Sequence, residues 1–170
     1  MQILEPQQFV SWNEPIEMLY ACHERVKKFC RQLRILPDYL EKNGCNSVVQ
    51  NDVKTIINYF NIAAPLHHED EEHDFFPVLK MQRPETTKII QELESQHAII
   101  HQIWPALSSQ LNALLDGERN DVDKTLIEHF IQAYQEHIRL EEPLFELGRR
   151  HLTTEQLAVM GKVMFRRRQK

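Results

Sequence analysis

Apolar residues recur every three to four positions along most of this chain, which is the spacing of an amphipathic α-helix. Asn43 and Gly44 mark the end of the first helix, and Thr153 begins a capping sequence for the last. Pro65 should kink or locally open the second helix, because proline removes a backbone hydrogen bond. We therefore expect an all-α protein with four long helices and a short fifth, over residues 15–40, 47–80, 84–115, 122–150 and 154–166.

The composition supports a single globular domain that spans residues 1–170. Of the 170 residues, 42% are hydrophobic, 26% are charged and only four are glycine, whereas sheets with tight hairpins use more glycine. The formal net charge of −5 argues against a nucleic-acid partner. We expect the basic run at residues 166–170 to be a frayed, solvated end.

Targeting signals are not evident in the sequence. The start of the chain lacks the basic and apolar blocks of a signal peptide, and no apolar run is long enough to span a bilayer. The three cysteines form no C-x-x-C motif and indicate neither a disulfide framework nor a zinc site. These features predict a cytoplasmic protein with no membrane partner.

Candidate metal ligands lie on or beside the apolar stripes of four predicted helices. Three pairs are separated by four residues, a step of roughly 400°, so both members of a pair face the same side of a helix. Buried carboxylates are costly unless paired or metal-bound, and imidazole with carboxylate favours first-row transition metals over calcium or magnesium. We therefore expect a di-metal site made of His23, His67, Glu71, His97, His101, His137 and Glu141.

Each of these residues also has a plainer interpretation. His23 alone would be an ordinary partly buried histidine, and the acidic run at residues 67–74 alone would be a solvated helix face. The coincidence on four helices favours the metal site. His67-x-x-x-Glu71-Glu72 is repeated at residues 137–142, which supports this register, although His68 and Glu72 are also four residues apart. In the favoured register, residues 68, 69, 72 and 73 surround the site or face solvent.

These motifs resemble the hemerythrin-like HHE cation-binding family over residues 14–150. The resemblance is carried by the string at residues 67–77, by Glu94-x-x-His97, and by the His137–Phe145 segment. It implies an up-down-up-down four-helix bundle around a non-heme di-iron centre with an oxo or hydroxo bridge. The five histidines would then be terminal ligands and the two glutamates would bridge. Of the five histidines, His101 is the ligand that the motifs define least.

The resemblance further implies that oxygen or nitric oxide binds at an open iron position, or that the protein handles or senses iron. Oxygen-carrying hemerythrins place the last carboxylate as His-x-x-x-x-Asp, whereas this chain has His137-x-x-x-Glu141. Repair of iron–sulfur centres and di-iron oxidase or peroxidase activity are the alternatives. Ferritin-like oxidases carry Glu-x-x-His on two helices, and only Glu94-x-x-His97 has that form here, so a metal- and gas-binding protein is favoured over an enzyme. It could be a monomer or a homodimer.

Overall fold

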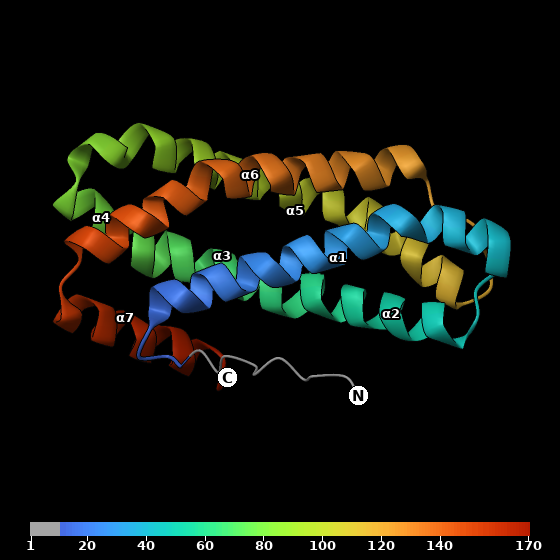
Figure 1. Cartoon of the computed structure of the whole chain (residues 1–170), viewed down its shortest axis with the longest axis horizontal. Helices are drawn as coiled ribbons and strands as arrows, with labels where there is room; N and C mark the ends of the chain where they lie inside the picture. The colour runs from blue at the N-terminus through green and yellow to red at the C-terminus, as the bar shows by residue number, and fades with distance from the viewer. Residues whose placement is uncertain (1–10) are drawn as a thin grey trace, which may run out of the picture.

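The computed structural model describes residues 11–170, and every regular element within them is helical. The helix α1 spans Pro15–Asn43 and ends at Gly44, whose φ of 68° favours glycine. A short turn, η3 (Pro84–Thr86), leads into α5 (Thr87–Leu115), and α6 (Lys124–His151) and α7 (Thr154–Arg167) follow. The all-α prediction is confirmed, and each of the five predicted helices has a counterpart (Figure 1).

The second predicted helix is a continuous helical stretch whose winding changes twice. Its regular parts, α2 (Ser47–Asn58), α3 (Ala64–Asp70) and α4 (Phe76–Gln82), are separated by the π-helical segments η1 (Tyr59–Ala63) and η2 (Glu71–Phe75). Pro65 and Pro77 each stand two residues beyond a π segment. Because proline has no N–H to donate, the regular hydrogen-bond ladder is interrupted there, and the wider winding accommodates the interruption. The opening predicted at Pro65 therefore occurs, and a second one accompanies Pro77.

Neighbouring large side chains are buried together at three places along this stretch. Neighbours in a regular α-helix differ by about 100°, so two adjacent large side chains seldom both face inward. Along α2–α4, however, three adjacent pairs of large side chains are buried: Tyr59 with Phe60, His67 with His68, and Phe75 with Phe76. The stretch therefore presents two neighbouring histidines to the interior.

The apolar interior consists of two clusters with a polar layer between them. The large core includes Val26, Leu33, Val53, Leu107 and Phe130. The small core includes Leu19, Phe76, Ile90, Phe145 and Met164. On each of the four long helical stretches, buried histidines or glutamates fall between the residues of one core and those of the other. None of the described helices combines the length and hydropathy that a bilayer span requires.

The fifth helix, α7, covers one end of the molecule beside the start of α1 (Figure 1). Thr153 and Gln156 form the predicted capping box at its beginning. Its Met160 and Met164 side chains are buried in the small core. The prediction of a frayed, solvated end was wrong for Arg167 and Arg168, because both form ion pairs with the buried Asp70. Sequence alone does not reveal this partner, which lies nearly a hundred positions away.

Candidate metal centre

The polar layer between the two cores holds seven potential metal ligands in two groups. The first group is His68, Glu71, His97 and His137, and the second is His23, His67, Glu71 and Glu141. Within each group, every residue offers one ligand atom that lies within 4.8 Å of those of the others. All seven residues are buried, and Glu71 and Glu141 are fully enclosed. Glu71 belongs to both groups and therefore stands where a bridging carboxylate would.

The structure brings together six of the seven sequence-predicted residues and leaves His101 outside both groups. His101 is exposed, and its Nε2 lies 3.0 Å from Nδ1 of His68. His68, which the sequence analysis placed around the site or on the surface, instead occupies the first group. His67 and His68 both lie in the regular α3, so their side chains point about 100° apart and enter different groups. The sequence analysis treated the two registers as alternatives, whereas the layer takes a histidine from each. It expected Pro65 to open the helix but did not use that opening to set the direction of His67 and His68.

Glu141, on α6, also contacts histidines of both groups. Oε2 of Glu141 lies 3.0 Å from Nε2 of His23, in the second group. The same oxygen lies 3.1 Å from Nε2 of His137, in the first group. Glu71 behaves similarly, because its Oε1 lies 2.9 Å from Nε2 of His67 and its Oε2 lies 3.2 Å from Nε2 of His97. Each carboxylate therefore contacts histidines of both groups.

The sequence repeat Glu-Glu places one carboxylate inside the layer and the next one behind a histidine of another helix. Glu72, which follows Glu71, accepts a hydrogen bond from Nδ1 of His97 at 2.6 Å. Glu142, which follows Glu141, accepts one from Nδ1 of His23 at 3.3 Å. A histidine that donates from Nδ1 keeps its Nε2 lone pair available toward the centre.

In His137 and His68, Nδ1 faces a neutral side chain and not a carboxylate. Nδ1 of His137 donates to the side-chain oxygen of Gln96 at 3.2 Å. Nδ1 of His68 faces His101, which leaves Nε2 of His68 buried and without a hydrogen-bond partner among the described residues. Burial and the neighbouring histidines hold the pKa of His68 well below its usual value, so its ring stays neutral. A neutral imidazole with a free inward nitrogen is the form that binds a metal ion.

The pKa values of Glu71 and Glu141 are shifted in opposite directions. Burial and the charge of Glu141 raise the pKa of Glu71 well above its usual value. Burial also acts on Glu141, but His137 and His23 outweigh it and lower the pKa of that carboxyl well below its usual value. Two carboxylates that share one buried site do not both ionise easily. Burial disfavours the charged form of His97, yet the neighbouring carboxyls of Glu71 and Glu72 outweigh it and raise the pKa of His97 to about 9.

Unpartnered polar atoms provide a test of whether a metal ion fits this layer. Both carboxylate oxygens of Glu71, one of Glu141, and the inward nitrogens of His67 and His68 have no hydrogen-bond partner among residues 11–170. Buried polar groups without partners are rare because they cost free energy. Cations placed among these atoms would satisfy all of them. The residues therefore fit bound metal ions.

Comparison with known proteins agrees with this geometry. The family model described as "Hemerythrin HHE cation binding domain" matches residues 14–147. The chain belongs to the hemerythrin HHE cation-binding family. The region that matches the HHE family includes both groups of the centre. The chain is also 63% identical over 169 residues to a Haemophilus influenzae protein described as "Uncharacterized protein", covering 99% of this chain and 98% of that one.

Glu94 lies outside the centre of this HHE domain. It stands three residues before His97, as in the Glu-x-x-His motif of ferritin-like sites. Its half-exposed carboxylate instead faces Nζ of Lys80, with Oε1 at 4.0 Å. The position of Glu94 therefore does not favour a ferritin-like oxidase site.

Proposed function

We propose that this HHE domain binds two iron ions in the polar layer and uses them to bind oxygen or nitric oxide, or to handle or sense iron. The observation that carries the proposal is the set of buried, unpartnered carboxylate oxygens that face inward-directed histidine nitrogens. We further propose that residues 14–150 form an up-down-up-down bundle and that α7 completes the same domain.

In the proposed arrangement, His68, His97 and His137 hold one ion, and His23 and His67 hold the other. Glu71 and Glu141 bridge, because each contacts histidines of both groups. The geometry favours His68 over His101 as a ligand, since His101 reaches only the outer nitrogen of His68. His101 would then orient His68, as Glu72 orients His97.

Five histidines with two carboxylates suit iron better than calcium or magnesium, which prefer oxygen ligands. Two six-coordinate ions accept more ligands than these side chains supply, so the ions could also take up a small external molecule. The protein residues would hold the ions, and the apolar cores on either side would exclude bulk water from the layer. Which of the proposed uses applies depends on what binds in addition to the side chains.

Metal content per chain, together with a visible spectrum of the reduced protein before and after exposure to air, tests this proposal. We expect stoichiometric iron. A new charge-transfer band that decays when oxygen is removed would support gas binding, whereas irreversible oxidation would support sensing or iron handling. His137→Ala should lose metal without unfolding, while His129→Ala, an exposed position on the same helix, should keep it. A wild-type protein that takes up no stoichiometric metal when iron is supplied would contradict the proposal.

A further inference from the structure

Asp70 is an acidic residue whose side chain is only 2% exposed, and it sits between His68 and Glu71 in the chain. Both of its carboxylate oxygens are bound by arginines from the end of α7. Arg168 reaches them with Nη2 at 2.6 Å and Nη1 at 3.1 Å, and Arg167 forms an ion pair with Oδ1. Arginine suits such a position because its planar guanidinium forms several directed hydrogen bonds.

Arg167 also contacts carboxylates on both sides of Glu71. Its Nη2 lies 2.8 Å from Oδ2 of Asp74, and its Nε lies 3.4 Å from Oε2 of Glu69. Asp74 belongs to the π segment η2, whereas Glu69 and Asp70 belong to the preceding α3. One guanidinium therefore ties together the two windings that meet at Glu71. Since the rotation of the chain at this junction sets the direction of the Glu71 side chain, Arg167 is well placed to fix it.

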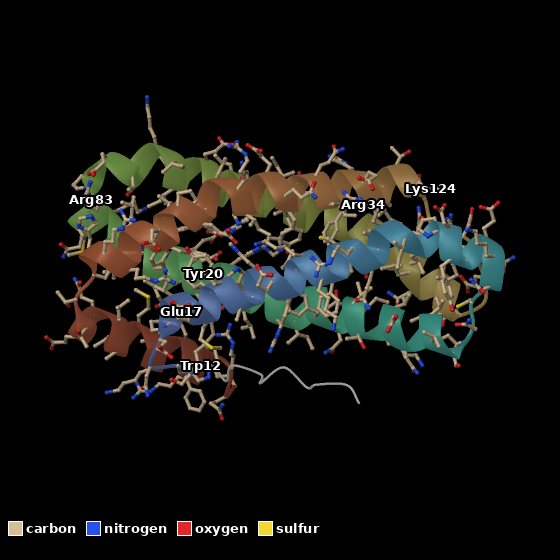
Figure 2. The ribbon with its side chains drawn as sticks, viewed as in Figure 1. Trp12, Glu17, Tyr20, Arg34, Arg83 and Lys124 are labelled. Carbon is tan, nitrogen blue, oxygen red and sulfur yellow. The ribbon has the colours of Figure 1, made fainter. Side chains whose placement is uncertain are left out.

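The end of α7 is itself held firmly in place. The guanidinium of Arg168 lies over the ring of Trp12 at 4.6 Å and donates to the backbone oxygen of Met164 at 3.0 Å. Trp12 lies close against α7 (Figure 2). Its backbone oxygen approaches Gly161 so closely that a Cβ there would stand 1.8 Å away. The arginines thus reach Asp70 from a docked helix and not from a loose tail.

We propose that Arg167 and Arg168 are positioning residues for the metal centre, which clamp Asp70 and so determine how long the centre retains its ions. This inference rests on the proposed function, because it concerns the same ions. An Asp70 carboxylate without its arginines would turn toward water or bind water in the interior. Either response would rotate the chain between His68 and Glu71 and weaken the ligands on both sides.

The test is the rate at which a chelator removes iron from the loaded full-length protein. We expect Arg167→Gln and Arg168→Gln to release iron about tenfold faster, the low end of the effect of losing a residue that contacts a metal ligand directly, because these arginines act on the ligands through the backbone. Arg167→Lys should fall between wild type and Arg167→Gln, because an ammonium contacts fewer oxygens at once. Arg166→Gln, an exposed neighbour on the same helix, should leave the rate unchanged.

Two controls separate positioning from general destabilisation. Val53→Ala lies in the large core and should lower the free energy of unfolding without accelerating iron release. In a double-mutant cycle, adding Arg168→Gln to Asp70→Asn should accelerate release no further, because Asp70 is the carboxylate through which Arg168 acts. Release at the wild-type rate from the arginine variants, or acceleration by Val53→Ala of the same size, would overturn the positioning role while leaving the metal site intact. A wild-type chain that holds no iron would overturn both proposals.

Discussion

A histidine that can bind a metal ion in this layer has a ring nitrogen directed into it, whereas a histidine that only orients a ligand does not. His68 has its inward nitrogen free and its outer nitrogen beside His101, whereas His101 is exposed and reaches only His68. The two residues are chemically identical but occupy successive positions on a path from the centre to solvent. They therefore form a natural pair for mutational comparison.

We expect His68→Ala to lose one of the two proposed ions, and His101→Ala to keep both with an affinity about tenfold lower. The reason is that the first substitution removes an inward nitrogen, while the second removes only its orienting partner. Iron per chain and chelator competition measure the two effects. The reverse order, with His101→Ala losing an ion and His68→Ala retaining both, would show that His101 is the ligand, as the sequence first suggested.

At the scale of elements, helical periodicity located all five helices to within a few residues. Six of the seven residues that it singled out lie together in the polar layer, including both members of the i, i+4 pairs His67/Glu71 and His137/Glu141, whereas in α5 only His97 does. The exception is the stretch from α2 to α4, where the π segment η1 shifts the phase of the helix before His67 and His68. Periodicity assumes a constant angle per residue, so a pattern carried from α2 across η1 does not give the inward face of α3. Likewise, the partner of Arg167 is fixed by packing at the bundle end, which no local pattern records.

A glycine allows α6 to pack against the η2 segment. A Cβ added at Gly148 would stand 2.5 Å from the ring of the fully buried Phe75 and 3.3 Å from Ile16. Gly148→Ala should therefore lower the free energy of unfolding by about 1–3 kcal/mol despite alanine's better helix propensity. Urea denaturation measures this change. Ser109→Ala, on the exposed face of α5, should change stability by less than about 0.5 kcal/mol, and equal stabilities for Gly148→Ala and wild type would contradict the expected overlap.

At the scale of the whole molecule, the polar layer interrupts what would otherwise be one continuous apolar core. Both carboxylate oxygens of Glu71 and one of Glu141 lack hydrogen-bond partners within the described part of the chain. Such groups cost free energy until a cation binds them. Metal binding should therefore stabilise the fold as well as equip it for function.

Glu71→Met tests this cost directly. The substitution replaces a fully buried, unpartnered carboxyl with an adaptable apolar side chain. We expect the metal-free protein to become more stable by about 1–4 kcal/mol, as when other buried ionisable groups are replaced by apolar side chains, while iron binding is lost. Urea denaturation in the presence of a chelator and metal analysis measure the two outcomes. Glu41→Met, at an exposed position of α1, is the control and should change neither stability nor iron binding. A Glu71→Met protein less stable than wild type would contradict the expected cost of burying this carboxyl.

Metal affinity should increase with pH. The pKa of about 9 of His97 means that its ring holds a proton in the metal-free chain near neutral pH, and the raised pKa of Glu71 favours the protonated form of that carboxyl as well. Metal binding must displace those protons, so lower pH favours the metal-free form and higher pH favours the loaded form. Each displaced proton changes the affinity by about tenfold per pH unit below the pKa. Chelator competition between about pH 6.5 and 8.5 measures the slope, and an affinity independent of pH would contradict proton displacement.

The division of the interior into two cores has a consequence for protein engineering. The large core and the small core meet only across the polar layer, so side chains on the two sides share few neighbours. Substitutions that share no partners usually combine additively. A library that repacks the large core could therefore be screened for thermal tolerance separately from one that varies the small core and α7. The two best solutions could then be joined in a single gene without redesigning the layer between them.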